Sequence, residues 1–123
     1  MGAAAECAVA KLLGLDWTGH YDQPKSTPDI EPNFEVRWRG YSNPEYQELY
    51  IRKDDYDDRY YILTCHGRGE KGFEIVGGIW GEDAKTRGRW DNPGWKGWAY
   101  WVPKDQVEPI ENIFLVKYQG MMV

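Results

Sequence analysis

The sequence predicts an α+β fold, in which one N-terminal helix packs on a mostly antiparallel or mixed sheet of about five strands. Three observations predict this class. Strong helix formers fill residues 3–13, an alternation of apolar and polar side chains begins at Phe34, and several short apolar runs follow between turn residues. At 123 residues the chain has the length of one ordinary domain, so we expect a single domain over residues 1–123.

The first expected element is a helix over residues 3–13, AAAECAVAKLL. Val9, Leu12 and Leu13 fall at helical spacing, and Gly14 stands where a helix commonly ends. Residues 16–33 contain three prolines among Gly, Asp and Ser, which excludes a regular central element. This stretch is therefore expected to be a loop that ends in a turn.

Residues 34–39, FEVRWR, follow as a half-buried strand. Since successive side chains of a strand point to opposite faces, the strand has an apolar and a polar face, formed by Phe34, Val36 and Trp38 and by Glu35, Arg37 and Arg39. With the helix on one side of the sheet, its other face is expected to be open to other uses.

Four more strands are expected, over residues 48–54, 59–66, 73–80 and 98–103. The acidic turn of residues 54–58 joins the first two of these. The short connections predict an antiparallel meander.

The remaining segments of the second half are expected to be irregular or helical. A double glycine at Gly77 indicates a bulge or a close backbone approach in the strand that contains it. Residues 81–97 predict a surface excursion with one helical turn at residues 82–86, and residues 104–110 predict a short helix before the tail.

Charge and composition restrict the classes of function. The chain has 20 Asp and Glu residues against 15 Lys and Arg residues, so no global positive field draws it onto nucleic acid or an anionic membrane. Any phosphate-binding surface must be local. Glu6 and Lys11 interrupt the N-terminal apolar stretch, and no run approaches the roughly 18 apolar residues of a membrane span. Cys7 and Cys65 lack a CxxC spacing, so we expect a reduced, soluble, cytoplasmic protein with no membrane partner.

The stretch TPDIEPNFEVRWRG, residues 27–40, holds the best candidate for a chemical site. Glu35 and Arg37 project from one strand face, and Asp29 in the preceding turn can reach the carboxylate of Glu35. Two carboxylates brought together repel unless a cation lies between them. Mg²⁺ prefers such oxygen ligands and can activate water for attack on a phosphodiester. In the alternative interpretation, Asp29 caps a turn and Glu35 pairs with Arg37 or Arg39 on a solvated face.

These residues resemble the PD-(D/E)XK nuclease superfamily, with Pro28-Asp29 followed by Glu35-Val36-Arg37. Glu6 stands on the first helix, where many members have an additional acidic residue. The run from AECAVAKLLGL through PDI, FEVRW and IWGEDAK to YWVPKDQ is similar to small proteins of this type from tailed phages. The resemblance implies a restriction-endonuclease-like core, a DNA partner, Mg²⁺ or Mn²⁺ held by Asp29, Glu35 and Glu6, and, for a phage protein, the host cytoplasm.

One residue departs from the family pattern, because Arg37 stands where the family has lysine. Arginine stays protonated and its planar fork does not replace an ammonium group at a water or a leaving oxygen. Lys53, or Lys25 upstream, could take that role, so the catalytic candidates are Asp29, Glu35, Arg37 and Lys53. The alternative is a degenerate copy that keeps the fold and has lost cleavage.

The segment KTRGRWDNPGWKGW, residues 85–98, interleaves cations, tryptophans and glycines. This mixture suits a flexible arm that contacts phosphates and stacks on bases, with Lys85, Arg87, Arg89, Trp90 and Trp95 as the candidate residues. Its alternative is a loop folded back on its own tryptophans. Two other functions compete with the nuclease reading: a non-catalytic protein-interaction module, such as a phage accessory or inhibitor protein, and carbohydrate binding through exposed tryptophans.

Overall fold

The computed structural model describes residues 2–14, 28–30, 33–39, 48–66, 73–92 and 97–121. Its elements confirm the α+β class and the N-terminal helix. In chain order they are α1 (Gly2–Leu13), β1 (Phe34–Arg39), β2 (Leu49–Ile51), β3 (Tyr60–His66), β4 (Phe73–Trp80), α2 (Gly81–Arg87), β5 (Arg89–Asp91), β6 (Ala99–Val102), the 3₁₀ helix η2 (Lys104–Gln106), β7 (Glu108–Pro109) and α3 (Ile110–Met121).

The strands form two sheets, with the orders β1-β3-β4-β7 and β2-β6-β5. The expected antiparallel meander is wrong at its start, because β1 pairs in parallel with β3, from Phe34↔Tyr60 to Arg39↔Cys65. Instead of returning beside β1, β2 pairs antiparallel with β6 in the second sheet. The chain between β1 and β3 therefore serves as the long crossover that a parallel pair needs.

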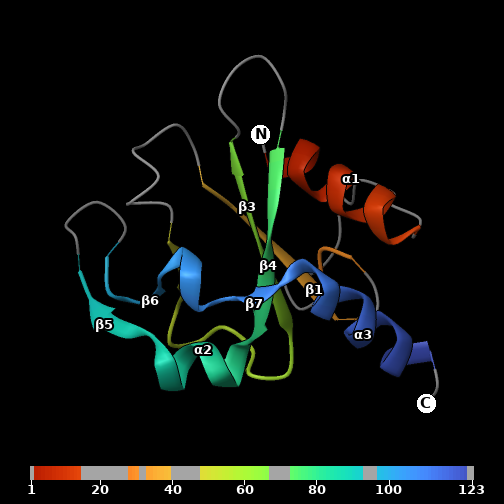
Figure 1. Ribbon diagram of the computed structural model, residues 1–123. Coiled ribbons are helices and arrows are strands. Elements are labelled where there is room, and N and C mark those ends of the chain that lie inside the picture. The colour runs from red at the N-terminus through yellow and green to blue at the C-terminus, as the bar shows by residue number, and fades with distance from the viewer. Residues whose placement is uncertain are drawn as a thin grey trace.

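The first sheet lies in the middle of three layers (Figure 1). α1 and α3 pack on one face, where their side chains surround Phe34, Tyr60 and Ile62. The second sheet and α2 cover the other face, where they meet Tyr61 and Leu63 of β3. The expectation of an open second face is therefore wrong, and the polar side of β1 lies between two layers of structure.

The double glycine of β4 confirms both features expected of it. The register with β3 shifts between Leu63↔Gly77 and Thr64↔Ile75, which leaves Val76 as an additional residue. Gly77 has a φ of +156°, and a Cβ there would lie 1.9 Å from the carbonyl oxygen of Glu108 in β7. Only glycine allows this approach of the two strands.

The C-terminal half is more regular than expected. The helical turn expected at residues 82–86 is α2, and residues 89–91 form β5, so this part of the expected surface excursion is regular structure. The short helix expected at residues 104–110 is confirmed only over residues 104–106, as the 3₁₀ helix η2, and β7 follows it. α3, which was not predicted, begins at Ile110 and packs Ile113 and Val116 into the core. Within the described residues, no helix is long and apolar enough to cross a membrane.

Candidate functional site

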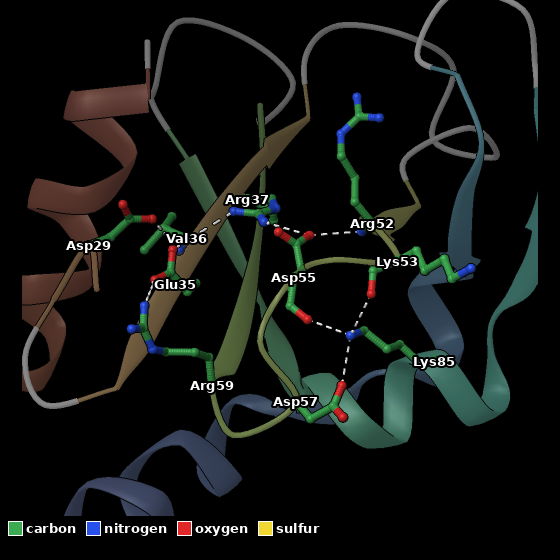
Figure 2. A network of polar contacts seen from close by, with 10 residues as sticks. All are labelled: Asp29, Glu35, Val36, Arg37, Arg52, Lys53, Asp55, Asp57, Arg59 and Lys85. Atoms are coloured by element: carbon green, nitrogen blue, oxygen red, sulfur yellow. Dashed lines mark hydrogen bonds and ion pairs between the residues drawn. The ribbon is translucent and has the colours of Figure 1, made fainter. Parts of the chain in front are cut away.

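A tight reversal of the chain places Asp29 beside β1. Ile30 and Phe34 exchange two backbone hydrogen bonds, of 3.0 and 2.9 Å, so the chain folds back directly before the strand. The carboxylate of Asp29 then accepts a hydrogen bond from the backbone N–H of Val36, at 2.9 Å (Figure 2). Because β1 is an edge strand, it has N–H groups that face away from β3, and Asp29 uses one of them. Asp29 is thereby fixed next to the residue that follows Glu35.

Glu35 is largely buried and paired with arginine. Its Oε1 lies 2.5 Å from Nη1 of Arg59, its Oε2 lies 4.0 Å from Nη1 of Arg37, and its side chain is 13% exposed. The alternative of a solvated face is therefore wrong for this strand, because the second sheet and the turn before β3 cover it. Glu35 does contact Arg37, as that alternative expected, but at a longer distance than Arg59.

Glu35 keeps its proton to a higher pH than an ordinary carboxyl group. Burial, followed by the negative charge of Asp29, raises the pKa of Glu35 from 4.5 to about 7, although Arg59 and Arg37 act in the opposite direction. The influence of Asp29 means that the two carboxylates interact through space. Burial is the larger cause, and the guanidinium groups of Arg59 and Arg37 supply positive charge beside the pair.

This raised pKa predicts a stability that depends on pH. Between about pH 4.5 and 7, folded Glu35 keeps a proton that the unfolded chain has lost. The free energy of unfolding is therefore expected to fall as the pH rises through this range, by up to about 3 kcal/mol. Urea denaturation at pH 5, 6, 7 and 8 measures this. Glu35→Gln has no such proton, so the difference between the wild type and this variant should shrink toward low pH; a difference that is constant with pH would contradict the assignment.

Arg37 is anchored by residues other than Glu35. Its Nη2 donates to Oδ2 of Asp55 at 3.0 Å, and its guanidinium carbon lies 4.9 Å from the ring centroid of Tyr61 and 5.7 Å from that of Tyr50. Burial lowers the pKa of Arg37, but the charge of Asp55 and its hydrogen bond raise it more, so the guanidinium stays protonated. Arg37 therefore links β1 to the turn between β2 and β3.

Lys85 of α2 holds that same turn in place. Its ammonium group donates to the carbonyl oxygens of Lys53, at 3.0 Å, and of Asp55, and it lies 2.7 Å from Oδ1 of Asp57. The predicted contact of Lys85 with nucleic acid thus competes with bonds inside the fold. The predicted strand over residues 48–54 ends at Ile51, so Lys53 lies in the turn, and Figure 2 shows its side chain directed away from Glu35.

Glu6 is half-buried on α1. The described residues contain no group of three or more His, Cys, Asp and Glu side chains arranged to hold a metal ion. Glu6 is therefore not gathered with Asp29 and Glu35 into such a group, and the candidate site consists of two carboxylates.

Arg59 is the site residue that the sequence analysis missed. It reaches Glu35 because it immediately precedes Tyr60, which pairs with Phe34 in the parallel register of β1 and β3. No local pattern in the sequence marks this residue, since its role depends on a pairing between strands that are far apart in the chain. The acidic turn of residues 54–58, which precedes Arg59, indicates only candidate carboxylates in the sequence.

A second surface lies on the β5–β6 hairpin. The rings of Trp90 and Trp98 stack with centroids 5.7 Å apart and planes at 18°, and Trp90 also contacts Tyr100 at 4.7 Å. Trp90 is 44% and Trp98 is 55% exposed. Exposed indole rings of this kind are large apolar surfaces that can stack on a planar ligand.

The positively charged side chains near this tryptophan pair differ in whether they form ion pairs. Arg89 is exposed but lies 3.3 Å from Oε1 of Glu48 and 3.4 Å from Oδ2 of Asp91. Arg87 is exposed at the end of α2. The prediction for Trp95 falls outside the described residues, as does that for Lys25. Since residues 85–87 end α2 and residues 89–91 form β5, the flexible arm expected there is wrong for that part of the segment.

A scan against protein-family models finds no matching family, and searches of curated proteins and of solved structures find no match either.

Proposed function

We propose that this chain is a nuclease-like protein that acts on DNA, with Asp29 and Glu35 as the ligands of a divalent cation, Mg²⁺ or Mn²⁺. The observation that carries the proposal is the hydrogen bond from Val36 N–H to Asp29. Val36 is the residue after Glu35, so this bond fixes the carboxylate of Asp29 next to Glu35 in the strand. The electrostatic coupling of Asp29 to Glu35 supports it. Hard oxygen ligands of this type suit both cations.

The geometry of the two acids is compatible with a metal site. Asp29 uses Oδ2 for the hydrogen bond, and within the described part of the chain its Oδ1 has no hydrogen-bond partner. The bond to a backbone group orients the ligand, as outer partners of metal ligands commonly do. When bound, the cation would activate water and neutralise charge on a phosphodiester. The nearby guanidinium groups would attract the phosphate, because arginine forms forked hydrogen bonds with it.

Incubation of the purified protein with supercoiled and single-stranded DNA tests the proposal. We expect nicking in the presence of Mg²⁺ or Mn²⁺ and none in the presence of EDTA. Absence of nicking and of Mn²⁺ binding would reject the proposal. Mn²⁺ binding together with metal-dependent DNA binding, but without nicking, would instead identify a catalytically inactive form.

That inactive form is the second candidate, and a specific observation favours it. Arg37, at the position of the family lysine, is held by Asp55 and two aromatic rings, and Lys53 is directed away from Glu35. Neither cation is placed for proton transfer at the acidic pair. A DNA-binding protein of this kind would keep the metal site and its affinity for phosphate.

The stacked tryptophans supply the proposed contact with unpaired bases. Trp98→Ala removes the more exposed indole ring. We expect the affinity for a single-stranded oligonucleotide to fall about tenfold, since stacking of one base on an aromatic ring contributes about 1–3 kcal/mol. Fluorescence anisotropy of a labelled oligonucleotide measures the effect.

Phe114→Ala is the matched control for this variant, because Phe114 is an exposed aromatic residue on α3, away from the hairpin. Its affinity should equal that of the wild type. Equal oligonucleotide affinities of Trp98→Ala and wild type would exclude stacking of a base on Trp98. A loss of glycan binding by Trp98→Ala, with oligonucleotide binding unchanged, would point to a carbohydrate ligand instead.

A further inference from the structure

A row of aromatic rings runs from the β5–β6 hairpin to the end of α2. Trp98 stacks on Trp90, and Trp90 contacts Tyr100, with ring centroids 5.7 and 4.7 Å apart. At the end of this row, Gly88 lies so close to Tyr100 that an added Cβ would be 2.9 Å from the Cβ of the tyrosine. Gly88 directly follows Arg87, the last residue of α2, so the row reaches the end of that helix.

This aromatic row lies on the face of the second sheet that α2 covers. Ile51 of β2 pairs with Tyr100 of β6, so both side chains point to the same face. Ile51 and Ala84 of α2 are buried in one cluster, and Tyr100 packs against that cluster. The helix and the aromatic row therefore share a face, and Arg87 is exposed where the two meet.

The acidic side chains of β5 and its neighbour lie on the other face. Because successive side chains of a strand point to opposite sides, Arg89 and Asp91 point away from the side that Trp90 occupies. Arg89 pairs there with Glu48 and Asp91, at 3.3 and 3.4 Å. The sheet therefore separates the aromatic row from these two carboxylates, as well as from the charge of Arg89.

Arg87 differs from the other described cations of this segment. Lys85 is bound to Asp57 in the turn before β3, and Arg89 is bound to two carboxylates. Arg87 is exposed, and within the described residues neither Asp83, one turn earlier on α2, nor another carboxylate forms an ion pair with it. An external anion can therefore bind this guanidinium group without breaking an ion pair of the fold.

We propose that this face is a binding site for single-stranded DNA that needs no metal ion: unpaired bases stack on the indole rings of Trp90 and Trp98, and Arg87 contacts the phosphate backbone. Aromatic rings beside a cation are the combination that binds single strands without sequence preference, because every base has a flat face. The inference rests on the base contact in the proposed function, but not on the proposed metal site. It assigns the phosphate contact to Arg87 and not to Arg89.

Arg87→Gln tests this assignment through the salt dependence of binding. Fluorescence anisotropy of a labelled oligo-dT strand, in the presence of EDTA, gives the binding constant from about 50 to about 200 mM salt. One phosphate contact with a single strand contributes about 0.7 to the slope of log K against log salt concentration. Arg87→Gln should therefore reduce that slope by about 0.7. Since the contribution vanishes near about 1 M salt, the affinity should fall about eightfold at 50 mM and about threefold at 200 mM. An oligo-dA strand should show the same change, because a phosphate contact does not depend on the base.

Three further variants complete the experiment. Arg87→Lys keeps the positive charge, so it should retain the wild-type slope. Arg89→Gln removes the paired arginine on the opposite face, and Lys11→Gln removes an exposed cation of α1. Both change the net charge of the chain as Arg87→Gln does, and both should retain the wild-type slope.

The outcomes separate this inference from the proposed function. A wild-type slope and affinity in Arg87→Gln, or an equal loss in Arg89→Gln, would overturn the assignment and leave the base contact of Trp98 standing. A cation in the last turn of a helix also stabilises that helix. If this is the whole role of Arg87, Arg87→Gln lowers the melting temperature with an unchanged slope, and the inference is overturned. If the wild type binds neither oligonucleotide in EDTA, the inference fails, while the nicking assay and Mn²⁺ binding decide the metal site independently.

Discussion

Glu35→Gln is expected to lower metal-dependent nicking of supercoiled DNA at least about 100-fold, because even a change in the outer partners of a metal ligand typically costs 10–100-fold. Glutamine has the size of glutamate and can still accept a hydrogen bond from Arg59, so the fold should persist. What it loses is the negative charge that the cation needs. The measurement is the initial nicking rate at a saturating concentration of Mg²⁺, with Mn²⁺ as a second cation.

Asp29→Asn should give a similar loss for a separate reason. An asparagine oxygen can still accept the hydrogen bond from Val36 N–H, so the variant keeps the position of the side chain and removes its charge. Asp105→Asn is the matched control, since Asp105 is an exposed acidic residue in η2. Wild-type rates in Glu35→Gln or in Asp29→Asn would exclude that residue as a ligand required for cleavage.

Arg37→Met is expected to destabilise the protein by about 3 kcal/mol, the lower end of the cost of removing one partner from a buried ion pair. The variant leaves Asp55 without its guanidinium partner and opens the stack between Tyr50 and Tyr61. We use the lower end because Asp55 keeps a second hydrogen bond, from the backbone N–H of Arg52 at 2.8 Å. Urea denaturation monitored by circular dichroism gives the free energy of unfolding.

The double variant Arg37→Met/Asp55→Asn serves as the control for this loss. Removal of both charges should recover part of the stability, because no buried carboxylate then stays unpaired. We assign Arg37 a structural role and not a catalytic one. An Arg37→Met protein of wild-type stability that no longer nicks DNA would contradict that assignment and would favour a direct role in the chemistry.

The elements that could be predicted from the sequence are those specified by local patterns. The spacing of Val9 and Leu13 marks α1, and the alternation from Phe34 onward marks β1 and its two faces. The pairing of these elements is not local. β2 has three residues, too few for a sequence pattern to show which strand it joins, and its departure to β6 lets β1 lie against β3.

In the candidate site, too, the features set by residues close in sequence could be predicted and those set by distant residues could not. Asp29 and Glu35 are close in sequence, and a single turn brings them together, so their proximity could be predicted. The polar face of β1 was expected to meet solvent because its side chains are charged. In the fold, Arg37 and Glu35 on this face pair with Asp55 and Arg59, which come from a different part of the chain. No pattern within β1 specifies these partners.

The most direct test of the central claim is a crystal soaked in Mn²⁺ and measured for anomalous scattering. We expect one strong anomalous peak between the carboxylates of Asp29 and Glu35. Density for both carboxylates in the arrangement described above, with no anomalous peak beside them at a Mn²⁺ concentration that labels other carboxylates of the crystal, would contradict the account.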